Sequence, residues 1–546
     1  ITCRDWSSDV CSSDLKMKRK ISLLTLLIIL LFFPTIIFSQ VEKSVVEKII
    51  EIAKTDNQTM NHLDVLTNRI GGRLIGSDAY ENATWWAASL YKKWGLEVQV
   101  IEVGELPVGF NRGPWFGRML SEDGMTLHFA TPSYTSGTKG VQRGHVVMEP
   151  KTRSEFERMK GKLKGAWVLI TGKSNGFPVD ISEYADTLRA QVIRENNMIG
   201  RYNDSVTRIN RSNPQKPPLP LKEYKDSPAL FYKEMREAGI LGIIQSASVP
   251  ITALYDRKNV EYMDFDNLPD CPDIKLNEHQ YKIIEQKVKE RQYFLLEFDI
   301  RNHFKPGPVK YHNVIGIIRG SEFPDEYIMS GGHLDAFDVA TGGVDCGTGV
   351  APNLEAARLI MAAGGKPRRS IAFCLWAGEE FGLLGSKHWV ESNRDKLDKI
   401  SNYFNRDGGP TIANSITVPP AMYEHFKIAT EDLNRINPDF PFKLNIRTEA
   451  RPKPVTAGGS DHAYFALNGV PAISFGTADP KGYDFNYQEI WHTERDTYNM
   501  SIPEYMDHTS VVMAIVYYKL ANLDSLLSRK DLYLEPVKSE GSGRRR

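Results

Sequence analysis

Two adjacent glutamates, Glu379 and Glu380, constrain the fold of this chain more than any other feature of its sequence. They follow the apolar run 370–375, which is typical of a buried strand, and a glycine-rich turn comes after them. Open α/β sheets place their chemistry at the ends of strands, where two neighbouring carboxylates repel each other unless a cation lies between them or one is protonated. The pair therefore predicts a metal site at the edge of an α/β sheet. One carboxylate binds the ion there, and the other takes a proton from the water that the metal activates.

Other side chains that bind metals follow strand-like or glycine-flanked segments along the chain. His333 ends the strand-like segment 327–333, and Asp335, two residues later, is placed to fix the tautomer of the imidazole. His492 has a similar companion in Asp496. Five candidate metal ligands thus occur in chain order: His333, Asp345, Glu380, Asp407 and His492.

The mixture of nitrogen and oxygen ligands indicates which metal fits. Such ligands suit zinc best, with manganese or cobalt as alternatives. Glycines around Asp345 let the backbone approach closely, so its carboxylate is placed to bridge two ions, and two ions about 3.5–4 Å apart form the usual co-catalytic pair. Any single acid among the 68 is more often solvated surface, but five such side chains in these contexts predict a metal centre.

Taken together, these motifs resemble the di-zinc exopeptidases of metallopeptidase family 28, in clan MH. The matching motifs are His-x-Asp at 333–335, Gly-Glu-Glu-x-Gly-Leu-x-Gly-Ser at 378–386, Gly-Ser-Asp-His at 459–462 and His-Thr-x-x-Asp-Thr at 492–497. The variant around residues 333–349 is most similar to the plasma glutamate carboxypeptidase branch, also called carboxypeptidase Q. The resemblance extends over most of the chain, from about residue 45 to about residue 525.

The resemblance implies a role for each residue of these motifs. Glu379 is the general base, and Asp335 orients one histidine ligand. His462 is a candidate donor to the oxyanion of the tetrahedral intermediate, and the alternative is that Asp461 and His462 only brace a loop. The implied ligands are His333 and Asp407 for one zinc ion, Glu380 and His492 for the other, and Asp345 for both.

One position departs from the family pattern. Many relatives carry Asp or Asn directly after the bridging aspartate, whereas this chain has Cys346. Its thiol is either a small packed side chain or an additional ligand. The change removes none of the implied ligands, so the expected activity stands.

Strand-like and helix-like segments alternate in the second half of the chain. The expected fold class is α/β, a mostly parallel sheet with helices on both faces, as in zinc exopeptidases. Strands are expected at 313–318, 327–329, 371–375 and 471–475, and helices at 79–94, 353–363 and 511–520.

An insertion interrupts this pattern. Residues 131–300 resemble a protease-associated domain, β-rich and of the α/β class, between peptidase parts at 41–130 and 301–525, with a tail at 526–546. Within the insertion, the polar stretch 173–228 is either a cap over the active-site cleft or an inert surface insertion.

The N-terminal residues suggest processing rather than structure. Ile1–Lys16 resembles the conceptual translation of a sequencing adapter, and we expect it to be an assembly artefact. Residues 17–39 combine a basic start, an apolar stretch and a small residue for cleavage, as signal peptides do, with a retained membrane anchor as the alternative. The three later cysteines, at 271, 346 and 374, are too few for a disulfide framework. The leader therefore predicts a periplasmic or secreted enzyme with no membrane contact after cleavage.

Charge and motifs together limit the function. Lys plus Arg equals Asp plus Glu, at 68 each, so no overall field favours nucleic acid. The leading hypothesis is a zinc exopeptidase acting on short peptides, of carboxypeptidase or dipeptidase type or else an aminopeptidase, with a homodimer left open by the resemblance. A glutaminyl-cyclase-like acyltransferase with a single zinc and a non-catalytic receptor are the alternatives.

Overall fold

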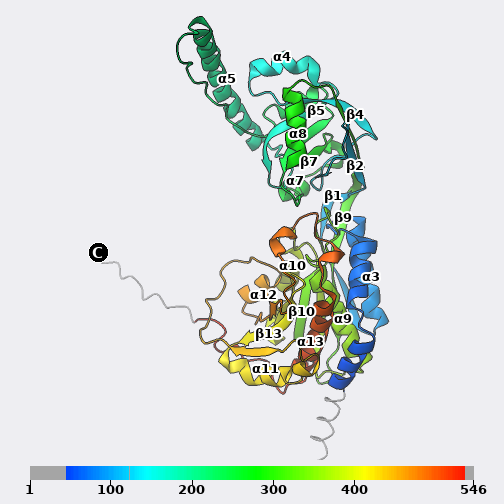
Figure 1. The fold of residues 1–546 in the computed structure, drawn as a ribbon. Helices are drawn as coiled ribbons and strands as arrows, with labels where there is room; N and C mark the ends of the chain where they lie inside the picture. Colours follow the sequence, from blue (N-terminus) through cyan, green and yellow to red (C-terminus); the bar gives the residue numbers. More distant parts are fainter. Residues whose placement is uncertain (1–44, 122, 535–546) are drawn as a thin grey trace, which may run out of the picture.

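The computed structural model describes residues 45–121 and 123–534 (Figure 1). The expected assembly artefact, the expected signal peptide and the end of the tail from residue 535 lie outside the described residues. Within the described part of the chain, no helix combines the length and apolarity that a membrane crossing requires.

A five-stranded mixed sheet carries the catalytic motifs, which confirms the expected α/β class. Its strand order is β1-β9-β11-β10-β12. The strands are β1 Glu97–Asn111, β9 His303–Ile318, β11 Arg369–Trp376, β10 Phe323–His333 and β12 Ile400–Asn405. Strand β10 pairs in parallel with β11 and β12, whereas β9 pairs antiparallel with both β1 and β11.

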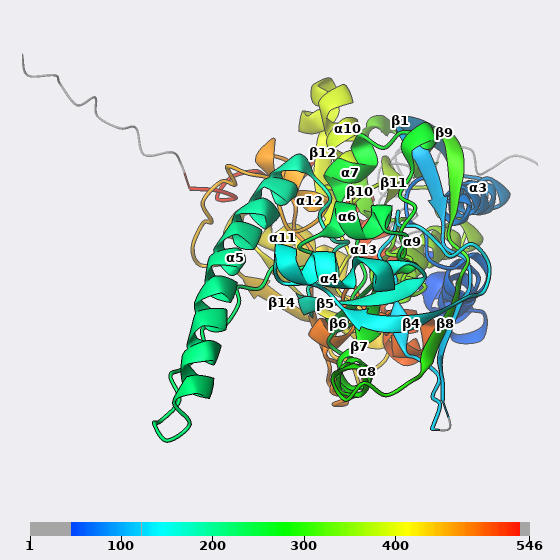
Figure 2. The same cartoon turned by 90° about the horizontal axis from the view of Figure 1, so that it is seen from above.

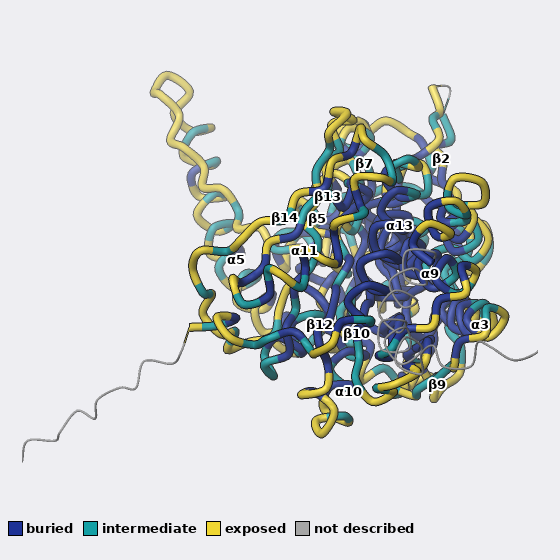
Figure 3. Tube along the Cα trace, turned by 90° about the horizontal axis from the view of Figure 1, so that it is seen from below, coloured by how far each residue is buried: buried dark blue, intermediate teal, exposed yellow. Residues whose placement is uncertain are grey.

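Helices cover both faces of this sheet, and alternate residues of β11 point into each layer. Ile371, Phe373 and Leu375 pack on one face, where helices α3 Asp78–Lys93, α9 Gly347–Ala362 and α13 Pro503–Ala521 lie. Cys374 and Trp376 pack on the other face, against α10 Leu384–Ser392 and α12 His462–Leu467. Burial on both faces explains why the strand reads as one continuous apolar run. Figure 3 shows this interior as a dark column through α9, α13 and β10.

A second, seven-stranded sheet lies between β1 and β9 in the chain, in the order β2-β8-β4-β5-β6-β7-β3. Its strands are β2 Trp115–Leu120, β3 Phe129–Ala130, β4 Gln142–Met148, β5 Ala166–Ser174, β6 Gly242–Ala247, β7 Asp273–Asn277 and β8 Leu295–Ile300. The sheet has hydrophobic clusters of its own, and the long strands β1 and β9 connect it to the catalytic sheet (Figure 1). Its identification as a protease-associated domain remains a prediction.

The polar stretch in the insertion forms a projecting arm. Helix α5, Glu183–Ser212, extends away from the catalytic sheet in Figure 1 and reaches beyond the body of the molecule in Figure 2. This direction disfavours the expectation that the stretch caps the active site of its own chain. Three asparagines seven residues apart clamp the returning chain to the helix: Asn196, Asn203 and Asn210 each donate to one backbone carbonyl, of Lys225, Lys222 and Leu219. Each also accepts the N–H of the same residue, at 2.8 Å. Seven helical residues and three extended ones both advance about 10 Å, so the two repeats match.

The expected strand at 471–475 begins later than predicted. Strand β15 covers Phe475–Ala478 in a small sheet of order β14-β13-β15, with β13 Ile412–Val418 and β14 Lys443–Ile446. The preceding residues do run beside β12, where the N–H of Tyr403 donates to the carbonyl of Pro471 at 2.8 Å. Farther along, the side-chain amide of Asn402 takes over: it donates to the carbonyl of Ile473 at 2.9 Å and accepts its N–H at 3.0 Å.

Candidate metal centre

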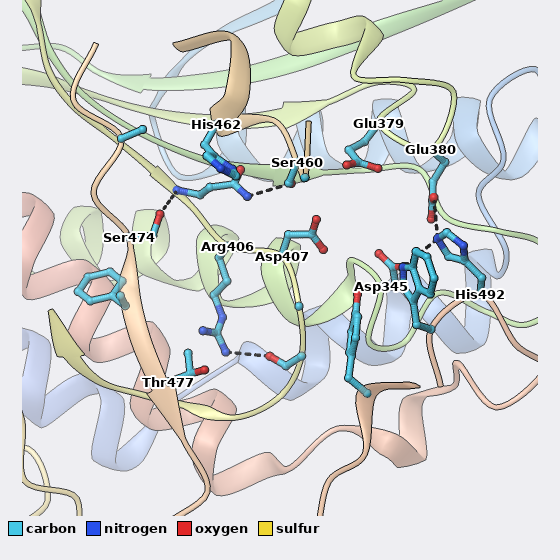
Figure 4. Close-up of a pocket in the computed structure, with 18 of the residues that line it drawn as sticks. Asp345, Glu379, Glu380, Arg406, Asp407, Ser460, His462, Ser474, Thr477 and His492 are labelled. Carbon is cyan, nitrogen blue, oxygen red and sulfur yellow. Dashed lines mark hydrogen bonds and ion pairs between the residues drawn. The ribbon is translucent and has the colours of Figure 1, made fainter. Parts of the chain in front are cut away.

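The structure brings all five predicted ligands together around Asp345. The two oxygens of Asp345 face different histidines: Oδ1 lies 3.1 Å from Nε2 of His333, and Oδ2 lies 3.4 Å from Nε2 of His492. Nε2 of His333 also lies 3.5 Å from Oδ1 of Asp407, and Nε2 of His492 lies 3.0 Å from Oε2 of Glu380. Figure 4 shows Asp345, Glu380, Asp407 and His492 turned toward one cavity.

Parallel strands explain why residues so far apart in the sequence meet. His333 is the last residue of β10 and lies in register with Trp376 at the end of β11, so Glu380 follows only a few residues beyond the same edge. Asp407 comes just after β12, on the other side of β10. The carboxyl ends of these three strands therefore place three ligands at one edge, as expected for an open α/β sheet. Asp345 and His492 reach the same point from loops, and His492 does so in the left-handed region, at φ 58°.

The carboxylates of this cluster face histidines rather than lysines or arginines. Among the described residues, no Lys or Arg forms an ion pair with Asp345, Glu380 or Asp407, and their charged contacts are with His333 and His492 alone. Within the part of the chain that the structure describes, three buried ligand atoms have no hydrogen-bond partner: Nε2 of His333, Oε1 of Glu380 and Oδ1 of Asp407. Burial, reinforced by Asp345, raises the pKa of Glu380 well above its usual value. A divalent cation would satisfy these atoms, and the imidazole and carboxylate donors suit one.

The neighbouring Glu379 is placed beside this cluster rather than in it. Burial, followed by the charges of Asp461 and Glu380, raises the pKa of Glu379 to about 10, although His333 opposes the rise. Its side chain lines the same cavity as the ligands Asp345 and Glu380. This is the position that a proton acceptor for a metal-activated water requires.

Two aspartates brace the loops that carry the ligands. The carboxylate of Asp335 accepts the backbone N–H groups of Glu379 and Glu380 at 3.1 and 3.2 Å, and its backbone carbonyl lies 2.9 Å from Nδ1 of His333. Asp335 therefore contacts His333 mainly through its carbonyl, because its carboxylate lies farther away, at 3.7 Å. Asp496 accepts the N–H of Val344 at 2.6 Å, so it holds the loop of the bridging aspartate rather than the imidazole of His492.

Arg73 is a structural contributor that sequence reasoning missed. Its side chain is fully buried, and its guanidinium donates to the carbonyls of Leu334 and Thr341 at 2.8 Å each, and to Gly342 at 3.1 Å. It thus ties the loop after His333 to the loop before Asp345. The sequence signal for this role is a single arginine within the glycine-rich, apolar segment 70–77.

The thiol of Cys346 is packed in the interior. Its thiol donates to the carbonyl of Arg406 at 3.2 Å, and burial raises its pKa to about 12. The sulfur nevertheless lies within reach of His333 and Asp407 as a third ligand atom. The hydrogen bond to Arg406 favours a packed thiol over a metal ligand.

A cavity of about 730 Å³ opens onto the cluster. His462, at the start of α12, lines it together with Glu379, and the neighbouring Asp461 is fully buried. His333 is covered completely, so a substrate would meet the other ligands first. Figure 4 shows His462 and Glu379 on the same side of the site, with Ser460 between them.

Comparison with known proteins places these residues in a family. Residues 313–516 match peptidase family M28. The "Probable glutamate carboxypeptidase LAMP1" of Arabidopsis thaliana is 33% identical over 229 residues, and the match covers 39% of this chain and 32% of that protein, about a third of its length. "Carboxypeptidase Q" of Mus musculus is 22% identical over 493 residues, which covers 89% of this chain and 91% of that protein.

A solved structure shares the fold. The crystal structure of a peptidase M28 precursor from Shewanella amazonensis SB2B superposes with a TM-score of 0.53 at 20% identity, and the match covers 90% of this chain and 98% of that one. All five candidate ligands lie within the matched residues, as do strands β10, β11 and β12. This chain therefore carries a peptidase family M28 domain over residues 313–516.

Proposed function

We propose that this chain is an exported exopeptidase that hydrolyses short peptides with the help of two zinc ions, of carboxypeptidase or dipeptidase type or else an aminopeptidase. The observation that supports this most is Asp345, whose two carboxylate oxygens face two different histidines in a buried cluster. The names of the relatives, glutamate carboxypeptidase and carboxypeptidase Q, support an exopeptidase. We infer export from the leader-like residues 17–39. We also propose that the enzyme forms a homodimer.

The residues divide into two ligand sets that share one carboxylate. His333 and Asp407 would hold one ion, Glu380 and His492 the other, and Asp345 both. When bound, the ions supply Lewis-acid chemistry and lower the pKa of water toward about 7.

The remaining residues move protons and hold charge. Glu379 takes the proton of the attacking water and returns it to the leaving amine, because its carboxylate borders both the ligands and the cavity. His462 donates to the oxyanion that forms on the scissile carbonyl. Asp335 keeps Glu379 and Glu380 in register through their backbone N–H groups.

A comparison of wild type with Glu379→Gln tests this proposal. We expect hydrolysis of dipeptides to be lost on chelation and restored by zinc, and the variant to keep its zinc while its rate falls by roughly 10²–10⁴-fold. Full activity of the variant would contradict the role of the base. A zinc content of one per chain with cyclisation of peptides that begin with glutamine would favour the acyltransferase instead.

A further inference from the structure

Among the described residues, one of the two cationic side chains that line the cavity has no partner for its charged group. Two arginines line it, Arg406 and Arg451. Arg406 is buried, and its guanidinium donates to the backbone carbonyls of Thr348, Gly409 and Thr411 at 2.9–3.1 Å. Arg451 is exposed, and its guanidinium forms no hydrogen bond or ion pair with any residue in the ranges that the structure describes.

Every anionic side chain that lines the cavity, among the described residues, already has a proposed role. The only carboxylates that line it, among the described residues, are Asp345, Glu379, Glu380 and Asp407, which are the ligands and the proposed base. A substrate ammonium group would have no carboxylate of its own to pair with there. A substrate carboxylate, in contrast, meets a free guanidinium, whose planar donors match a carboxylate in two parallel hydrogen bonds.

Aromatic side chains supply the rest of the wall. Tyr487 and Trp491 line the cavity, and the indole of Trp491 stacks on the ring of His492, with the centroids 4.0 Å apart. An apolar wall next to one cation suits the terminal residue of a peptide, with its side chain on the aromatics and its charged end on the arginine.

We propose that Arg451 binds the free α-carboxylate of a short peptide, so that the enzyme acts at carboxyl termini and on dipeptides. This inference rests on the proposed peptidase function and decides between its two directions. Arg451 is then a binding residue of the cavity and takes no part in proton transfer.

The test compares Arg451→Met with wild type on one dipeptide that has either a free or an amidated carboxyl terminus. We expect the variant to raise KM for the free acid by about 10- to 100-fold with little change in kcat, as for the loss of a charge-assisted pair, and to leave the amide unaffected. Arg451→Lys should recover part of the affinity. Arg447→Met is the matched control, because Arg447 lies on the same segment, donates to the carbonyl of Leu532 at 2.7 Å and does not line this cavity.

Two results would overturn the role of Arg451. One is an unchanged ratio between acid and amide in Arg451→Met, and the other is a wild-type enzyme that cleaves the amide as well as the acid but requires a free amino terminus. A zinc-loaded wild type that cleaves neither peptide would instead overturn the proposed function itself, so the two failures are distinguishable.

A separate observation concerns a segment of the insertion, residues 251–255, which we call the wedge segment. It contacts the loop that carries His492 on one side. The backbone N–H of Ile251 donates to Oε1 of Glu494 at 2.9 Å, and the N–H of Glu494 donates back to the carbonyl of Ile251 at 3.0 Å. Thr252 and Thr493 form an isolated β-bridge beside this pair.

The other side of the wedge segment contacts the loop that carries Glu380. The hydroxyl of Tyr255 donates to the backbone carbonyl of Glu380, and its ring stacks on Phe381 with the centroids 3.9 Å apart. The ring of Phe337 lies between the two: its centroid is 5.5 Å from that of the Tyr255 ring and 4.5 Å from that of the His492 ring. The wedge segment thus touches both loops whose ligands would hold one ion.

The geometry points to Tyr255 as a positioning residue that holds Glu380 and His492 at metal-binding distance, which makes the insertion a contributor to metal affinity. Groups that orient metal ligands typically change affinity 10- to 100-fold when they are removed. This inference holds whatever the substrate is, because it concerns only the metal-binding loops.

Zinc titration of the metal-free full chain against a competing chelator tests this role without measuring activity. We expect Tyr255→Phe to bind one zinc ion about 10-fold more weakly than wild type. Tyr134→Phe is the matched control, because Tyr134 is also buried and its hydroxyl also donates to a backbone carbonyl, that of Ile75 at 2.9 Å. Thermal unfolding should shift alike in both variants, and equal zinc affinities in Tyr255→Phe and wild type would overturn the role.

Discussion

Two buried clusters in this molecule both combine carboxylates with histidines, but only one of them also contains an arginine that pairs with its carboxylate. Glu355 on α9 is fully buried, and it accepts the N–H of Gln58 at 3.0 Å and two bonds from Arg358 at 2.8 Å. Nε2 of His62 lies 3.2 Å from it. Burial alone raises the pKa of Glu355, but the hydrogen bonds from Arg358 and His62 outweigh it and hold the pKa below its usual value.

The metal centre has the same combination of carboxylates and histidines without an arginine. Burial raises the pKa of Glu380 well above its usual value there, and one of its oxygens lacks a partner. A buried acid that is paired with an arginine has its charge compensated within the protein, whereas a buried acid without such a partner is a candidate ligand for an external cation. The opposite pKa shifts of Glu355 and Glu380 are the physical sign of that difference.

The largest effect should come from the residue that both ion sites share. Asp345→Asn removes the charge that faces both histidines, so we expect zinc content to fall for both ions and peptidase activity to fall by several powers of ten. Metal analysis after dialysis measures the first effect. Retention of both zinc ions by this variant would show that Asp345 is not shared.

Neutralising the other cluster should change stability and leave the metal in place. In Glu355→Gln, Arg358 and His62 lose their buried counter-charge, which costs roughly 3–5 kcal/mol of the free energy of unfolding. Urea unfolding measures this loss, and zinc affinity should match that of wild type. Loss of zinc binding in the folded variant would break the distinction between the two clusters.

A smaller effect concerns the pH dependence of the metal-free protein. Because the pKa of Glu379 rises from 4.5 to about 10 on folding, the native state holds a proton that the unfolded state releases. The stability from this group is fully present below pH 4.5 and is lost as the pH rises toward 10. We expect melting temperatures of the metal-free chain to fall across this window and Glu379→Gln to fall less. Identical pH profiles for the two proteins would argue against the raised pKa.

The smallest effect is expected at the cysteine beside the bridging aspartate. Since the thiol of Cys346 is packed and donates to the carbonyl of Arg406, Cys346→Ser should keep the hydrogen bond and change zinc affinity little. Cobalt substitution gives a direct reading, because a thiolate ligand produces an intense charge-transfer band. Such a band in wild type, absent from the variant, would make the sulfur a ligand.

Three of the five ligands could be predicted from the sequence because each lies at a strand end, a local pattern that an apolar run reveals. His333, Glu380 and Asp407 follow β10, β11 and β12 in this way. Strand direction has no such signal: β9 reads as apolar like its neighbours, yet it runs antiparallel to β11.

Contacts between distant segments were also invisible in the sequence. Tyr255 reaches the carbonyl of a residue 125 positions away, and Arg73 reaches loops more than 260 positions away. Both are side-chain to backbone hydrogen bonds, which leave no periodic pattern at either end. The asparagines of α5 are an intermediate case, since their seven-residue spacing is visible but their partners are not.

Anomalous scattering from zinc-loaded crystals is the most direct test of a metal pair at this edge of the sheet. We expect two peaks about 3.5–4 Å apart, one on each side of the Asp345 carboxylate, with His333 at one and His492 at the other. Full zinc loading with no peak beside Asp345 would contradict the assignment of this cluster as the metal centre.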